Sequence, residues 1–170
     1  PGLAHRLDTG TSGVLLVART AASWTDLRAA FRRHEVTKWY LAVVAGNPEP
    51  GRVIDAPLAH DPRDRRRMIP ARSGERAWPA WTRIVDRHPF GRWSLVLVEL
   101  ATGVTHQVRA HLGLVGHPVA GDPLYGGPPC DLGANRHALH AARIRVPAWD
   151  LDVAAPLPED LVRLAGGPPA

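Results

Sequence analysis

Hydrophobic positions recur at helical spacing in an early stretch of the chain. Trp24, Leu27 and Phe31 stand three and four residues apart, and Thr20 precedes them in the N-cap position. This pattern predicts an amphipathic helix over residues 21–34. We expect its three large side chains to pack in the core.

Two later stretches also have helical features. Over Thr105–Val115, the residues Val108, Leu112 and Val115 share one face, so this helix should bury all three. The turn before it and the glycine and proline after it are typical of helix boundaries. A short terminal helix is expected over Leu157–Leu164.

Shorter apolar runs bounded by Gly, Pro and Asn predict strands between these helices. The first of them, Gly13–Ala18, is continuously apolar and should be a buried strand. The other expected strands are Trp39–Ala45, Ala77–Asp86, Trp93–Leu100 and Ala138–Val146, with the middle two joined through residues 88–91. Hairpin-like neighbours and segregated helices favour an α+β fold with a mixed, mostly antiparallel sheet flanked by helices.

Length and composition fit one domain, residues 1–170, with an ordinary hydrophobic content of 45%. The longest apolar runs fall well short of the roughly 18–20 residues that a membrane span needs, and the first residues do not resemble a signal peptide. A single cysteine, Cys130, rules out an internal disulfide framework and fits a reducing compartment. We therefore expect a cytoplasmic protein without a membrane partner.

The positive charge of the chain comes almost entirely from arginine. The formal net charge is +5, and Lys38 is the only lysine among 21 basic residues. Arginine binds phosphates bidentately and stacks on bases, which suits RNA, although a GC-rich genome would also enrich it. The arginines are clustered, which indicates a footprint for a polyanion, although such runs also occur on merely solvated faces. The densest cluster, in one short loop, contains Arg63, Arg65, Arg66 and Arg67.

One carboxylate stands out near the start of the chain. Asp8 lies between a short apolar anchor and a glycine-punctuated loop, and an apolar strand is expected directly afterwards. A strand fixes the backbone while a loop leaves room for a ligand, so this is a suitable place for a general base or nucleophile. The simpler alternative is that Asp8 only caps a turn.

A second chemical segment begins the helix at Thr105–Val115. His106 and Arg109 lie three residues apart near the helix start, where Arg109 could reach a carboxylate such as Asp8. A paired guanidinium would hold that carboxylate in place and stabilise its charge. A surface arginine without a partner is equally compatible with the periodicity.

Several segments, in order along the chain, resemble the RluA-like pseudouridine synthases. The motif HRLD-TGTSG-VLLVA around Asp8 resembles the active-site motif of that family, and TGVTHQVRAHL followed by GHPVAGDPLYG resembles its second signature. The remaining matches are KWYLA at residues 38–42, DPRDRRRM at 61–68 and RHALHA at 136–141. Several ordered motifs in one short chain are far less expected by chance than any single motif.

The resemblance implies a function and a set of site residues. The chain would isomerise specific uridines in rRNA or tRNA, with Asp8 as the catalyst, Arg109 as its partner and Tyr40 stacked on the base. Arg6 would enter the RNA stack that the target base has left. The arginines at positions 63, 65, 66 and 67, together with Thr105 and His106, would bind RNA. The resemblance implies no cofactor, and we expect a monomer.

Two departures from the family pattern affect these expectations. Val104 stands where the family has arginine, and only four residues precede His5, where family members carry further strands and often an S4-type domain. We therefore expect a catalytic domain without its usual N-terminal segment. The alternative function is a non-catalytic RNA-binding remnant of the same fold. The histidines match no zinc-ligand spacing, so no metal site is expected.

Overall fold

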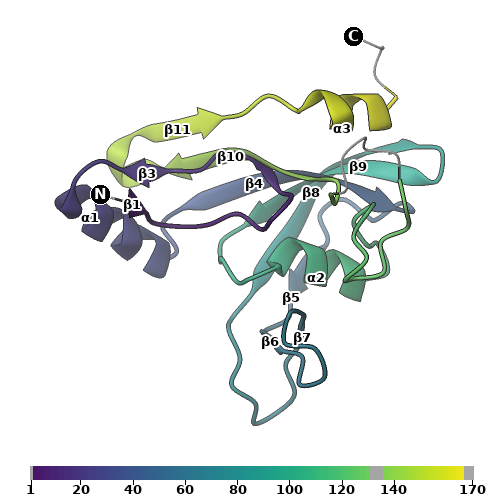
Figure 1. Ribbon diagram of the computed structural model, residues 1–170, viewed down its shortest axis with the longest axis horizontal. Helices are drawn as coiled ribbons and strands as arrows, with labels where there is room; N and C mark the ends of the chain where they lie inside the picture. Colours follow the sequence, from purple (N-terminus) through teal and green to yellow (C-terminus); the bar gives the residue numbers. More distant parts are fainter. Residues whose placement is uncertain (1, 131–135, 167–170) are drawn as a thin grey trace.

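A seven-stranded sheet forms the centre of the protein, for which a computed structural model describes residues 2–130 and 136–166 (Figure 1). Its strands lie in the order β11 (Leu151–Ala154), β10 (Leu139–Val146), β4 (Thr37–Ala45), β9 (Trp93–Leu100), β8 (Trp81–Phe90) and β5 (Val53–Asp55). These neighbours are all antiparallel, whereas the short β2 (Ser12–Gly13) joins β10 in parallel. The predicted α+β class and mixed sheet are confirmed.

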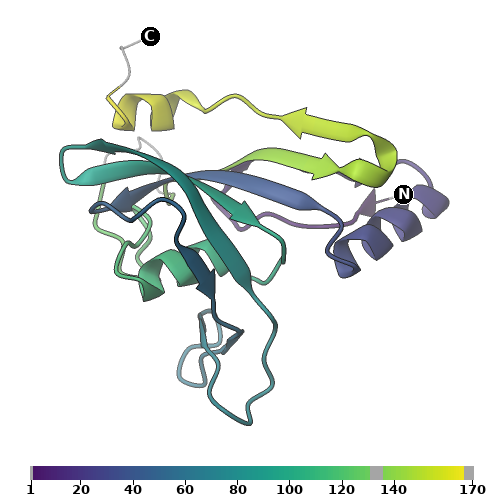
Figure 2. The ribbon, with the colours of Figure 1, turned by 180° about the vertical axis from the view of Figure 1, so that it is seen from behind.

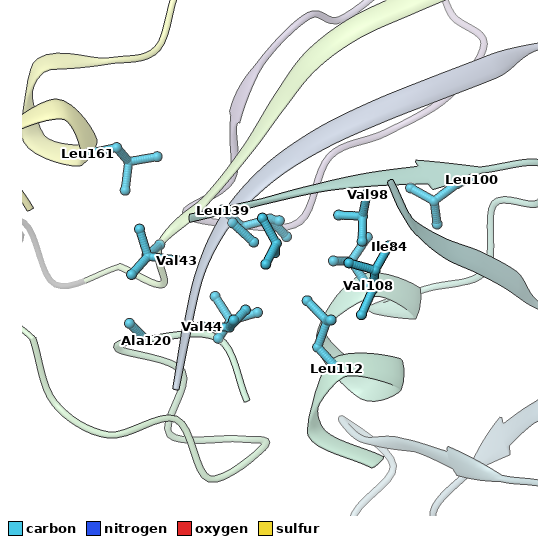
Figure 3. Close-up of a cluster of buried hydrophobic side chains, with 14 residues drawn as sticks. Val43, Val44, Ile84, Val98, Leu100, Val108, Leu112, Ala120, Leu139 and Leu161 are labelled. Atoms are coloured by element: carbon cyan, nitrogen blue, oxygen red, sulfur yellow. The ribbon is translucent and has the colours of Figure 1, made fainter. Parts of the chain in front are cut away.

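The core lies on both faces of this sheet. Helix α2 (Gln107–Leu114) covers one face, where Val108 and Leu112 meet Ile84 and Val98 (Figure 3). Helix α3 (Glu159–Leu164) contributes the fully buried Leu161 to the same hydrophobic cluster. Successive side chains of a strand point to opposite faces of the sheet. The side chains of β4 that point to the α2 side therefore lie close to this helix.

Helix α1 (Ala21–Arg32) begins and ends close to the predicted bounds. Thr20 is its N-cap, and the side chains of Thr20 and Ser23 form a capping box. Leu27 is buried as expected and Phe31 is partly buried, but the prediction of a core position for Trp24 is wrong, because 38% of this residue is exposed. Its indole Nε1 instead donates to the carbonyl of Leu3, in β1 (Gly2–Leu3), at 3.1 Å.

The prediction of one buried strand over Gly13–Ala18 is also wrong. This segment divides into the end of β2 and the separate β3 (Val17–Ala18), which pairs with β1. Gly13 has a φ of +118°, so the chain can turn away from β10 there. Leu15 and Val17 consequently remain 41% and 61% exposed.

The other two helices are shorter than predicted. Helix α2 starts after His106, whose φ of 55° places it in the left-handed region, and α3 starts at Glu159. Val115 follows the end of α2 and is only half-buried, so its predicted burial is wrong. Within the described ranges, none of the helices is long and apolar enough to cross a membrane.

The hairpin of β8 and β9 is tighter than expected, because β8 continues to Phe90, which pairs with Trp93. The predicted start of this strand at Ala77 is likewise too early, since β8 begins at Trp81. Three short strands, β5, β6 (Leu58–His60) and β7 (Met68–Pro70), and the edge strand β11 were not predicted. A 3-10 turn over Pro147–Trp149 joins β10 to β11. Strands β6 and β7 pair in an arm, residues 58–70, that projects from the sheet (Figures 1 and 2).

Candidate active site

Asp8 lies in the loop between β1 and β2, at the wall of a groove of about 450 Å³. Tyr40 of β4 and Val108 of α2 line the same groove, as do Arg6 and His106. The groove therefore gathers five of the ten residues that the sequence nominated, because Thr105 lines it as well. Asp8 keeps 18% of its side chain exposed, so a ligand in the groove can reach its carboxylate.

Arg109 joins Asp8 to a second carboxylate that is fully buried. Its Nη1 donates to Oδ2 of Asp8 at 3.3 Å, while Nε and Nη2 donate to Oδ2 and Oδ1 of Asp122 at 2.6 and 2.9 Å. The bidentate pair fixes the plane of the guanidinium, because two parallel hydrogen bonds leave it no rotational freedom. Asp122 thereby determines the direction in which Arg109 meets Asp8.

The charges in this cluster change the pKa values of its neighbours. Burial alone would lower the pKa of Arg109, but its hydrogen bonds and attraction to Asp122 and Asp8 raise it. Burial, together with the negative charge of Asp8, raises the pKa of Tyr40 to about 12. The Tyr40 phenol is therefore neutral near pH 7.

His106 presents a nitrogen to the same carboxylate. Its Nε2 lies 4.0 Å from Oδ2 of Asp8, and its Nδ1 lies 3.1 Å from the hydroxyl of Tyr125. This hydroxyl accepts a hydrogen bond from the backbone N–H of Met68 at 2.8 Å, so it can donate its own hydrogen bond to Nδ1 of His106. Burial lowers the pKa of His106. When Nδ1 accepts from the Tyr125 hydroxyl, the neutral imidazole carries its proton on Nε2, the nitrogen that faces Asp8.

The loop after Asp8 is fixed to β10 and to the segment just before it by two hydroxyl–imidazole contacts. Oγ1 of Thr11 lies 2.7 Å from Nε2 of His137, and Oγ of Ser12 lies 2.9 Å from Nδ1 of His140. Arg136 adds a hydrogen bond to the carbonyl of Gly10 at 3.1 Å, and is itself held by Asp160 of α3. These contacts hold the Asp8 loop against a central part of the sheet.

The arginines nominated for RNA binding come from two parts of the chain. Arg6 is exposed and lines the groove, as does the exposed Thr105. The other four occupy the loop of the arm, where Arg66 pairs with Asp64 at 2.7 Å and also borders a shallow hollow that contains Asp8. Arg67 lies over the ring of Tyr125 at 5.8 Å, while Arg63 and Arg65 are exposed. Their role in binding RNA stays a prediction.

Sequence reasoning missed Asp122 and Tyr125 as site residues, although both stand in a motif that it quoted. A fully buried aspartate requires a charged or hydrogen-bonding partner, but the sequence does not say which. Val104, the departure from the family pattern, packs against an apolar cluster at the base of the arm that includes Leu58 and Met68. Within residues 2–130 and 136–166, no group of three or more His, Cys, Asp or Glu residues is arranged to hold a metal.

Comparisons with known proteins point to one family. Residues 1–113 match the sequence model of the family described as RNA pseudouridylate synthase. An uncharacterized RNA pseudouridine synthase of Chloroflexus aurantiacus is 42% identical over an alignment of 166 residues that covers 95% of this chain and 51% of that protein. The ribosomal large subunit pseudouridine synthase D of Escherichia coli K12 is 34% identical over 96% of this chain and 54% of its own length.

Solved structures show the same fold. The human RNA pseudouridylate synthase domain containing 1 is similar with a TM-score of 0.76 at 31% identity, covering 91% of this chain and 68% of that one. The human RNA pseudouridylate synthase domain containing 4 is similar with a TM-score of 0.79 at 25% identity, covering 97% of this chain and 74% of that one. The chain spans about half the length of the curated relatives it matches. Motifs, fold and matched residues lead to one conclusion: the chain belongs to the RNA pseudouridylate synthase family.

Proposed function

We propose that this chain isomerises uridine to pseudouridine in RNA, with Asp8 as its catalytic residue. The observation that carries the proposal is the carboxylate of Asp8 in an open groove, held by Arg109, which Asp122 holds in turn. A carboxylate fixed by a preorganised guanidinium is the arrangement that a nucleophile or general base needs. Family membership supports the same reaction.

The reaction breaks the N1–C1′ bond of the uridine, turns the uracil, and rejoins it through C5. It transfers no electrons and needs no group donor, so one positioned carboxylate is sufficient. Three routes use the same carboxylate: Asp8 attacks C1′, attacks C6, or takes the 2′ proton. In each of them Arg109 directs the carboxylate, and Tyr40 stacks on the uracil as a neutral phenol.

Tyr40 also has a place in the last proton transfer. The negative charge of Asp8 contributes to the raised pKa of Tyr40. On the route through C1′, Asp8 leaves the substrate as a carboxylate when C5 bonds to C1′, so it is available to accept the proton from C5. Tyr40, a neutral phenol stacked on the uracil, assists that transfer by holding the base in place.

The target base has to leave the RNA stack, at a cost of a few kcal/mol. Arg6, which is exposed and lines the groove, would fill the vacancy. The arginines of the arm, of which Arg66 borders the hollow that contains Asp8, would contact phosphates. Such contacts release counterions, so we expect RNA affinity to fall steeply with salt concentration.

Large-subunit ribosomal RNA is the first substrate to test, because relatives such as the Escherichia coli protein are named for it. We further propose that the chain acts as a monomer. The single cysteine supports a cytoplasmic location.

The test is to incubate the protein separately with unmodified large-subunit rRNA and with tRNA, digest each RNA to nucleosides, and separate pseudouridine from uridine by chromatography. The wild type should form pseudouridine and Asp8→Ala should form none. Asp152→Ala is the matched control, because Asp152 also pairs with an arginine, Arg143, but on β11 and outside the groove. Binding of RNA without any product would instead support the non-catalytic alternative.

A further inference from the structure

The groove of Asp8 continues past Tyr40 to a buried lysine that the reaction described above does not use. Lys38 is only 9% exposed, yet it lines the groove. Its ammonium donates to the carbonyl of Thr102 at 2.5 Å and lies 5.8 Å from the centre of the Phe31 ring. An ammonium has three donors, so one hydrogen bond leaves most of its bonding capacity available.

This end of the groove carries positive charge without a counterion. Within residues 2–130 and 136–166, no carboxylate forms an ion pair with Lys38. The other charged side chains that line the groove are the cationic Arg6, Arg28 and Arg32, and Asp8, which is paired with Arg109. His5 and His34 are the further titratable groups at this end. Burial lowers the pKa of Lys38 to about 8, so it stays mostly charged at pH 7. A buried charge of this kind is costly unless a ligand balances it.

Gly103 keeps the ammonium accessible. A Cβ added to this glycine would lie 3.0 Å from Nζ of Lys38, so any other residue would cover the side from which a ligand can approach. Gly103 is exposed and lines the same groove. Its φ lies outside the left-handed region, so the backbone does not require glycine there. The lack of a side chain at Gly103 therefore leaves Nζ of Lys38 accessible and is not needed for the backbone conformation.

We propose that Lys38, approached over Gly103, is a phosphate subsite that binds a phosphodiester of the RNA at, or next to, the target nucleotide. That the ligand is RNA rests on the proposed function. That the ligand is an anion rests on the positive charge of Lys38, which no carboxylate balances. Lys38 and Tyr40 are alternate residues of β4, so their side chains share a face and their Cα atoms lie about 7 Å apart. The bound phosphate would therefore lie about two residues along β4 from the base that stacks on Tyr40.

The single lysine permits a direct test by NMR. Labelling lysine Cε with ¹³C in the full chain gives one lysine signal, which is followed during titration with single-stranded oligouridylate and, separately, with the uncharged nucleoside uridine. We expect oligouridylate to move the signal and to raise the pKa of Lys38 above its value of about 8, and uridine to do neither. A bound oligonucleotide that leaves the signal and its pKa unchanged overturns the subsite, as does a wild type that binds no oligonucleotide.

Two variants test the charge and the opening separately. Lys38→Met removes the charge and should reduce the salt dependence of oligouridylate binding by about one counterion. Gly103→Ala keeps the charge but covers it, and should weaken binding to a similar extent. Arg143→Met, an exposed cation outside the groove, is the control. Unchanged affinity and salt slope in both groove variants contradict the proposal. If the wild type binds oligouridylate as described but forms no pseudouridine, the phosphate subsite stands and the proposed function is contradicted.

Discussion

At the scale of single residues, the site depends on one arginine that bridges two carboxylates with different surroundings. Asp122 is fully buried and Asp8 faces the groove, so Arg109 transfers the fixed position of the first to the second. Lysine provides a point charge on a flexible stem and lacks the planar fork that both contacts use. Charge alone is therefore insufficient at this position.

We predict that Arg109→Lys lowers the rate of pseudouridine formation by about 100-fold or more, because a displacement near 1 Å at a reacting group has an effect of this size. RNA affinity should change little, since the phosphate contacts lie elsewhere. Single-turnover kinetics and binding measured on the same RNA separate the two effects. Arg143→Lys is the matched control, because Arg143 makes an equally close bidentate pair with Asp152 outside the groove. An Arg109→Lys rate within a few-fold of wild type contradicts the bridging role.

At the scale of elements, the position of Asp8 depends on the parallel contact between β2 and β10. His140 and Ala141 of β10 pair with Ser12 and Gly13, and the hydroxyl of Ser12 repeats this contact through the His140 ring. A Cβ on Gly13 would lie 2.2 Å from the carbonyl oxygen of Ala141, so no other residue fits without separating the two strands.

Gly13→Ala should therefore move the Asp8 loop away from the sheet. The clash and the positive φ of +118° both oppose the substitution. We expect stability to fall by roughly 1–3 kcal/mol and pseudouridine formation to fall further than stability explains. Urea unfolding and rate measurements below the unfolding transition check this. Gly51→Ala, at a φ of +82° with open space around it, is the control for backbone strain alone. Equal losses of activity in the two variants would contradict the role of the β2–β10 contact.

The elements also show what a sequence can and cannot predict. Helix α1 and strands β4 and β9 were predicted closely, because their caps and periodic patterns are local. Strands β2 and β3 consist of two residues each and exist only through pairing with distant segments, so the apolar run there was misread as one strand. The site followed the same rule: Asp8 and Arg109 were found from motifs, but the Asp122 partner depends on a tertiary contact.

At the scale of the whole molecule, the fold keeps several ionisable groups buried, and this links stability to pH. Burial, with the nearby charge of Lys38, lowers the pKa of His5 to about 4, and burial with Arg109 lowers that of His137 to about 4. Both are neutral in the folded protein down to that pH. In the unfolded chain they take up protons near pH 6.5. The unfolded state therefore binds more protons between about pH 6.5 and 4.

Stability should consequently fall as the pH decreases through this window, by about 3 kcal/mol for each histidine at most. The carboxylates with lowered pKa values, such as Asp160 and Asp64, contribute only below it. Urea denaturation at a series of pH values measures the slope. His137→Gln should make the slope shallower, and a stability that stays constant from pH 6.5 to 4.5 would show that these histidines titrate normally in the folded state.

The most direct test of the central claim follows the proton that leaves C5 when the uracil rejoins the sugar. RNA carrying tritium at uracil C5 is incubated with the wild type, with Asp8→Ala and with Asp152→Ala, and tritium released to water is counted. The account predicts release by the wild type and by Asp152→Ala, and none by Asp8→Ala although that variant still binds the RNA. Release by a folded Asp8→Ala variant at the wild-type rate would contradict the assignment of Asp8, and a folded wild type that binds RNA without release would contradict the activity itself.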